Sequence, residues 1–164
     1  MNLHFLRAGS RRLAQVGALV ATVLTLLTSA ATAAPPALMS AASRHDFDTL
    51  VSRLEAAIGR HDMGLVAQAS ASRGAAARGV KIPGNAVLMV FRNDYAVRML
   101  AASVPAGIEA PLRLYVTEQP DGTAQISYPA PSAVFAPYGS AALDAMAREL
   151  DPVFAQIVAD AVAP

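Results

Sequence analysis

The sequence predicts an α+β fold: a single domain with an antiparallel-rich sheet packed on helices. Two kinds of pattern lead to this prediction. Residues 111–128 alternate apolar and polar side chains on both sides of a Pro120-Asp121-Gly122 turn, as a β-hairpin does. Apolar residues recur at helical spacing in 45–60 and again from Ser140 onward. Strand and helix patterns mixed around an antiparallel hairpin are typical of helices packed on one sheet.

The first 33 residues have the pattern of an export signal. Three arginines, ending with Arg12, precede an uncharged run over 13–28, and small residues close the segment at Ala31-Thr32-Ala33. A retained membrane anchor is the alternative, but threonine and serine dilute the end of the run, and a span needs about 20 apolar residues. We therefore expect a signal peptide at 1–33. Its removal leaves a periplasmic or secreted protein with no stable membrane insertion.

The purified exported protein is expected to begin at Ala34. Ala31 and Ala33 offer the small side chains that signal processing requires, whereas a cut after Ala34 would place Pro35 directly after the bond. Intact-mass measurement checks this prediction. A membrane-bound product that retains Met1 would show instead that the segment is an anchor.

Composition limits what the mature chain does. Removing 33 of the 164 residues leaves 131, enough for one domain that buries roughly two thirds of its unfolded surface. The removed segment takes three of the 13 basic residues and no acidic one, so ten basic residues face 12 acidic ones, a net charge near −2. The basic residues are also scattered singly. A protein that binds nucleic acid usually presents a stripe of basic residues to the phosphates. The sequence shows no such stripe, so nucleic acid is not an expected partner.

The chain has no cysteine, which excludes disulfides, thiolate nucleophiles and thiolate metal ligands. His45 and His61 are the only histidines after residue 33, and they are not spaced as a ligand pair on one helix face. Copper at His61-Asp62-Met63 is an alternative with thin support. The spaced acidic loop that binds calcium is missing as well. We expect no metal and no cofactor.

Weaker patterns complete the chain. Residues 34–42 are an N-terminal tail or first strand, and 43–163 form the single α+β domain. The unbroken apolar run 86–91 is typical of a strand covered on both faces, so we expect it at the sheet centre. The expected elements, in order, are an edge strand at 38–42, a helix at 45–60, a strand at 64–71, a helical turn at 72–78, a strand at 86–91, a helix from 93 that Pro105 stops, the hairpin, an irregular proline-rich stretch, and a helix from 140.

Two helices carry more detailed expectations. Asn93 is expected to cap the helix that follows the apolar strand. Pro152 interrupts the last helical pattern, and Asp151 before it is a good cap, so we expect a kink or a restart there. The predicted buried stripes are Val97, Leu100, Ala101 and Val104 in the first of these helices, and Leu143, Met146, Leu150, Val153, Phe154, Ile157, Val158 and Ala161 in the second.

Several short motifs occur together in the middle of the chain. They are Phe91-Arg92-Asn93-Asp94 after the apolar strand, Gly107-Ile108-Glu109-Ala110-Pro111, the Asp121-Gly122 turn and Tyr128-Pro129-Ala130-Pro131. In combination they resemble the domain of unknown function 302 family over about residues 43–160. The resemblance implies a β-α-β4-α fold of the TATA-binding-protein-like class, often a homodimer, with no established activity. Kinship of fold to a DNA binder does not transfer DNA binding.

The chain departs from the family where members carry histidine. Exported relatives often have an Asp-His pair near the end of the second strand, where this chain has Ser70-Ala71-Ser72. An Arg-His pair of the family corresponds here to Pro137-Tyr138. We expect this chain to lack any binding or catalytic role that those histidines have in relatives.

The polar residues that match the family pattern are Asn93, Glu109 and Tyr128. Their first interpretation is structural: a helix cap, a fixed loop before a strand, and a half-buried ring at the end of the hairpin. The functional interpretation is a polar pocket at one end of the sheet, which Arg113 and Tyr115 on the outer side of the hairpin would extend. We take these five residues as candidate ligand-binding residues and expect none to be catalytic.

Two classes of function follow. The first is an exported, non-catalytic module that forms a homodimer and binds a small-molecule ligand or an envelope protein. The alternative is a small hydrolase-type enzyme that uses Glu109 and neighbouring polar groups. A cleft with convergent polar groups would favour the enzyme, whereas a filled core and a flat apolar patch would favour the binding module.

Overall fold

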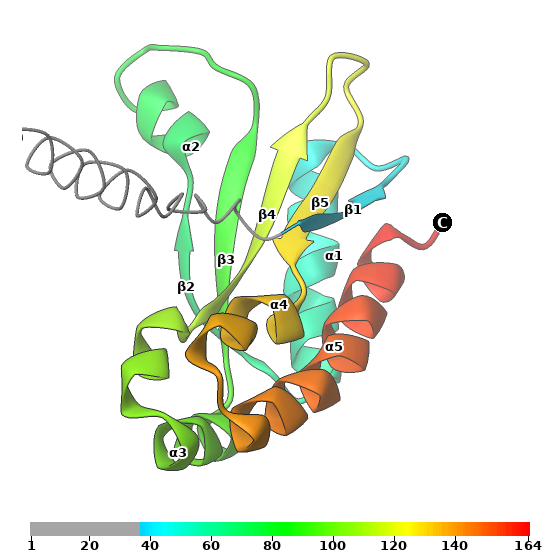
Figure 1. Ribbon diagram of the computed structural model, residues 1–164. Helices are drawn as coiled ribbons and strands as arrows, with labels where there is room; N and C mark the ends of the chain where they lie inside the picture. The colour runs from blue at the N-terminus through cyan, green and yellow to red at the C-terminus, as the bar shows by residue number, and fades with distance from the viewer. Residues whose placement is uncertain (1–36) are drawn as a thin grey trace, which may run out of the picture. The chain divides into compact units, whose positions relative to one another are not determined.

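A computed structural model describes residues 37–164, and the predicted signal peptide lies outside the described residues. They form one five-stranded sheet in which every neighbouring pair is antiparallel, in the order β1-β5-β4-β3-β2 (Figure 1). The predicted α+β class is confirmed. The strands are β1 (Leu38–Ala42), β2 (Gly64–Ala69), β3 (Asn85–Phe91), β4 (Leu112–Glu118) and β5 (Ala124–Pro129).

Along the chain a helix follows every strand except β4, which a turn joins directly to β5. The two long ones, α1 (Phe47–Arg60) and α5 (Ala141–Val162), pack against each other on one face of the sheet (Figure 1). With the strands they give the expected β-α-β4-α order. The shorter elements inserted into it are α2 (Ala71–Ala76), α3 (Asn93–Ala102) and α4 (Pro131–Phe135), with the 3-10 turns η1 (Val104–Glu109) and η2 (Ala136–Tyr138).

The core lies between the sheet and these two helices. Along β4, Leu112, Leu114 and Val116 are buried, whereas Arg113 and Tyr115 point away from the helices and are exposed. This alternation is that of a strand with one covered face. The helical stripes predicted in 45–60 and after Ser140 meet the buried side of the sheet, and every member of the second stripe except Val153 is buried.

The prediction for the apolar run at 86–91 is wrong in its placement. β4 is the central strand, and β3 is second from the β2 edge. Leu88 and Val90 are buried, but Val87 and Met89 on the opposite face are only half-buried. Both faces of the run are apolar, but α1 and α5 cover only one of them. The composition of the run therefore predicts more burial than the strand has.

The predicted buried stripe of α3 is also wrong. Val97 is 60% exposed, Leu100 46% and Val104 73%, while Met99 is the buried residue of the helix. α3 lies at one end of the sheet and contacts η1 and α5 (Figure 1). It is apolar on two sides, and only the side of Met99 faces the core.

The caps of the later helices differ from the prediction as well. Arg92, not Asn93, is the N-cap residue of α3, and it makes no side-chain cap hydrogen bond. α5 continues through Pro152 without a break, so no second helix begins at Asp151. The Asp151 carboxylate instead accepts a hydrogen bond of 2.9 Å from the Ser132 amide in the first turn of α4. This short helix occupies the stretch expected to be irregular, and Pro131 is tolerated there because a first helical residue needs no donor.

Candidate functional site

Three of the candidate residues gather at one end of the sheet. Asn93 follows the end of β3, Glu109 precedes the start of β4, and Tyr128 lies near the end of β5. Since β3 and β5 each pair with β4 in antiparallel orientation, the three positions share the sheet end that also carries α3 (Figure 1). Their side chains do not share an environment: Asn93 is exposed, Glu109 is half-buried and Tyr128 is buried.

Glu109 forms a hydrogen bond with a residue that the sequence did not identify as its partner. The Tyr138 hydroxyl donates a hydrogen bond of 2.9 Å to its carboxylate, which joins η2 to η1. That hydrogen bond is the main reason that the pKa of Tyr138 is raised. Tyr138 belongs to the Pro137-Tyr138 pair, which stands where the resemblance to the family implies Arg-His. The departure from the family pattern was the signal that could have drawn attention to this residue.

Tyr128 belongs to the core. Its side chain is 6% exposed, and its ring lies 6.2 Å from that of Phe154, centre to centre. Burial, and to a lesser degree the negative charge of Asp151, raise the pKa of the Tyr128 phenol. Its ring therefore offers little contact area to a ligand at the surface.

Arg113 and Tyr115 lie on the opposite face of the sheet, which we call the open face. Both side chains are exposed, and they have Met89 and Val87 beside them on β3. On the other side of Tyr115 is Ser127 of β5. The structure therefore divides the five candidates among the core, the sheet end and the open face, and it does not assemble them into one pocket.

An apolar cavity of about 30 Å³ lies at the same sheet end as Glu109. Its walls are almost entirely apolar, with Arg92 and Tyr95 as the polar exceptions. The Arg92 guanidinium stacks 4.3 Å from the centre of the Tyr95 ring and pairs with Asp94 at 2.8 and 3.0 Å. The volume is that of one or two water molecules. The remaining lining residues are Met63, Val90, Phe91, Ala96, Met99, Ala110, Leu112, Phe135 and Leu150.

A wider hollow of about 460 Å³ lies between the loop at 81–83 and the hairpin turn at 118–120. Its charged groups are Lys81 and Glu118, and the Glu118 carboxylate already accepts a hydrogen bond of 2.6 Å from the Gly84 amide. The hollow thus offers volume but few free polar groups to orient a ligand.

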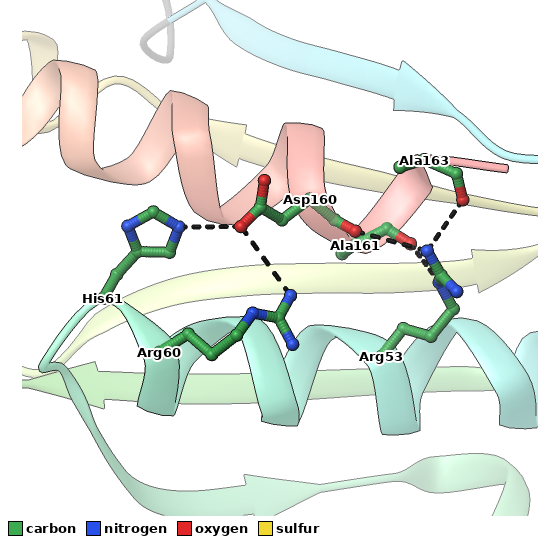
Figure 2. A network of polar contacts seen from close by, with 6 residues as sticks. All are labelled: Arg53, Arg60, His61, Asp160, Ala161 and Ala163. Carbon is green, nitrogen blue, oxygen red and sulfur yellow. Dashed lines mark hydrogen bonds and ion pairs between the residues drawn. The ribbon is translucent and has the colours of Figure 1, made fainter.

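Both described histidines join α1, or the loop beside it, to the end of α5. His61 Nε2 lies 3.0 Å from Asp160 Oδ2, and Arg60 lies 3.7 Å from the same oxygen (Figure 2). His45 Nε2 lies 2.8 Å from the Ala163 carbonyl oxygen. Within 37–164 no group of three histidine or carboxylate side chains is placed to hold a metal ion. These contacts join α1 and its flanking residues to the C-terminal end of α5. We call them, together with those of Arg53, the clamp.

Arg53 is the main member of this clamp, and no pattern in the sequence pointed to it. From the middle of α1 its guanidinium donates to the carbonyls of Ala161 at 2.9 Å and Ala163 at 2.8 Å (Figure 2). A third, longer contact of 3.4 Å reaches the Asp160 carbonyl. The last carbonyls of a helix have no partner within the helix and carry its negative dipole end, so a cation suits the position.

Acid is expected to weaken the clamp through Asp160. The hydrogen bond from His61 holds the pKa of Asp160 below its ordinary value. A carboxyl whose pKa is depressed in the folded state adds stability above its unfolded pKa, near 4, and loses it as the pH falls through the folded value. Asp160→Asn should therefore flatten the decline of unfolding free energy below about pH 4, as measured by urea melts at successive pH values. An unchanged acid limb in the variant would contradict this role.

These features define a class: an α+β domain with an antiparallel sheet, two helices on one face and no polar cleft around its candidate residues. The chain belongs to the domain of unknown function 302 family, because the family model described as "Domain of unknown function DUF302" matches residues 39–161. The fold is similar to the crystal structure of an uncharacterized conserved DUF302 protein from Bacillus stearothermophilus, with a TM-score of 0.68 and 20% identity, over 77% of this chain and 98% of that chain.

A search of curated proteins found no match to this sequence. At 20% identity the crystal structure supports the fold alone. Among the helices of the described part, none has the length and apolar character to cross a membrane.

Proposed function

We propose that this chain is an exported, non-catalytic domain that works by association: it forms a homodimer and binds a small-molecule ligand or an envelope partner. The observation that supports this proposal most is the exposure of large apolar side chains at α3 and η1, where Val104 is 73% and Ile108 82% exposed. Contiguous exposed apolar side chains are characteristic of surfaces that other molecules cover. The pattern that predicts an export signal at 1–33 favours a site of action outside the cytoplasm.

The polar residues support a binding role over a catalytic one. General acid–base catalysis needs a carboxylate placed in a cleft next to the reacting group. Glu109 instead accepts the Tyr138 hydrogen bond, and it does not line the nearby apolar cavity. Among the described residues no histidine or serine is hydrogen-bonded to Glu109. The hydrolase alternative thus gains no specific support from the geometry.

The open face is the surface we assign to the ligand or envelope partner. Arg113 and Tyr115 stand exposed in its middle strand, beside the half-buried apolar side chains of Val87 and Met89. Arginine and tyrosine are enriched where proteins bind partners, because each combines a broad apolar contact with directed hydrogen bonds. Asn93, exposed at the start of α3, stands apart from this surface.

Light scattering of the mature protein over a dilution series tests the homodimer. We expect twice the chain mass at high micromolar concentration, falling toward the monomer mass on dilution, because apolar contacts between identical copies are reversible by mass action. A monomer mass at every concentration would contradict the proposal.

A further inference from the structure

The apolar cavity at the sheet end opens at the start of α3. Its deep walls are buried core side chains, among them Val90, Phe135 and Leu150. The lining residues that are only half-buried lie at the junction of β3 and α3 and before β4; they are Phe91, Arg92, Tyr95, Ala96 and Ala110. The cavity therefore meets solvent between α3 and the approach to β4.

The deep part of the cavity suits an apolar group better than water. A buried water molecule typically makes about three hydrogen bonds to protein groups. The walls here are aliphatic, thioether and phenyl side chains, which offer almost no such partners. Met63 and Met99 are among them, and the unbranched methionine side chain adapts its shape to what it contacts. Apolar walls with a few polar groups at the mouth are typical of sites that bind small molecules.

α3 is the part of the lining that can yield to a larger occupant. At about 30 Å³ the cavity admits only the end of an alkyl chain, so a longer chain requires the helix to shift outward. Met99 is the only buried residue among the ten of α3, whereas eight of the 22 residues of α5 are buried. Segments with few buried apolar contacts open at a lower free energy than the core. Outside the core, α3 is tied to α5 by Arg98, which donates two hydrogen bonds of 2.7 Å to the Glu149 carboxylate.

Arg92 places a cation at the mouth of the cavity. It lines the cavity and its side chain is also 31% exposed, so the guanidinium is accessible from both sides. Asp94 engages Nε and Nη2 at 2.8 and 3.0 Å, which leaves Nη1 outside this pair. The guanidinium carries five N–H donors in a planar fork that matches a carboxylate. An anionic head group bound at Arg92 would leave its apolar chain directed at the cavity.

We propose that the cavity beneath α3 binds the alkyl chain of a small amphipathic anion, a medium-chain carboxylate, whose head group lies at Arg92. This inference rests on the small-molecule role proposed above and gives that ligand a site apart from the open face. The chain enters as α3 shifts outward, and the tie between Arg98 and Glu149 opposes the shift. A ligand that binds only the shifted form binds more tightly when the tie is absent, because less free energy is needed to reach that form.

Calorimetric titration with butanoate, hexanoate and octanoate tests the cavity. The association constant should rise by about fourfold for each further methylene that is buried. Ala96→Leu fills the cavity and should weaken octanoate binding by about tenfold, with Ala96→Val as the smaller change if the leucine variant does not fold. Ala101→Leu is the matched control, because Ala101 is exposed on the same helix and does not line the cavity. Binding that is independent of chain length, or equal in the filled variant and the unaltered protein, would overturn the site.

Arg92→Gln separates the head group from the chain. The variant should bind octanoate about tenfold more weakly and bind octanol as the unaltered protein does, since only the carboxylate uses the charge. An equal loss for the acid and the alcohol, or no loss for either, would overturn the assignment of Arg92.

Glu149→Gln tests the movement of α3. Without the tie to Arg98, octanoate should bind several-fold more tightly, whereas Arg148→Gln, at an exposed neighbouring position, should leave its affinity unchanged. Equal affinity in the two variants would show that α3 need not shift. If the unaltered protein binds no octanoate at millimolar concentration, the cavity site is wrong, while the homodimer is still decided separately by light scattering.

Discussion

Replacing Phe154 with alanine is expected to lower the free energy of unfolding by about 3–5 kcal/mol. The side chain is 1% exposed and lies on α5 against the ring of Tyr128, so its removal leaves a cavity between the last helix and β5. Urea melts of the unaltered protein and the variant measure the difference. The effect is large because the surrounding helices and sheet relax only partly into the space left behind.

Gln156→Ala provides the matched control for Phe154. Gln156 lies two residues further along α5 and is exposed, so its truncation should change stability by no more than about 0.5 kcal/mol. A loss of less than about 1 kcal/mol in Phe154→Ala would show that the ring does not pack in the core as described.

The second large effect is expected at Arg53. Arg53→Ala should destabilise the domain by about 1.5–3 kcal/mol, because hydrogen bonds from a charged donor are lost and the last carbonyls of α5 lose their partner. The contacts at stake are those to Ala161 and Ala163, at 2.9 and 2.8 Å (Figure 2). Thermal or urea unfolding measures the change.

Arg53→Lys separates charge from geometry at this position. Lysine keeps the positive charge near the helix end but lacks the planar fork that reaches several carbonyls at once. We expect it to recover part of the stability lost in Arg53→Ala. If Arg53→Ala is as stable as the unaltered protein, water satisfies those carbonyls equally well and the clamp contributes nothing.

The helices and strands that were predicted correctly are those whose sequence signals lie within a few residues of one another. The hairpin at 111–128 is present as β4 and β5, because alternation and the turn residues act within a few positions of one another. The helix expected at 45–60 is α1, which covers Phe47–Arg60, and the strand expected at 38–42 is β1 at the sheet edge. In each case the periodicity, the cap or the turn residue is contained in the element itself.

Burial of a given face was not predictable in the same way. The apolar run at 86–91 and the stripe from Val97 to Val104 both satisfy the pattern of buried elements, yet one is half-covered and the other is exposed. Periodicity shows that a face is apolar and does not show what lies against it. α4 went unpredicted for a related reason, since the Asp151 carboxylate that meets its first turn comes from a helix later in the chain.

The candidate site also combines features that the sequence determines with features that depend on how the chain packs. The sequence alone determined the α+β class, the absence of cysteine chemistry and the polar residues worth examining, because these depend on composition and short-range spacing. Only the tertiary structure decided that Tyr128 faces the core, that Glu109 meets Tyr138, and that Arg53 reaches the end of α5. Each of these contacts joins segments far apart along the chain, and such pairings are set by how helices and sheet pack, a property that no local pattern encodes.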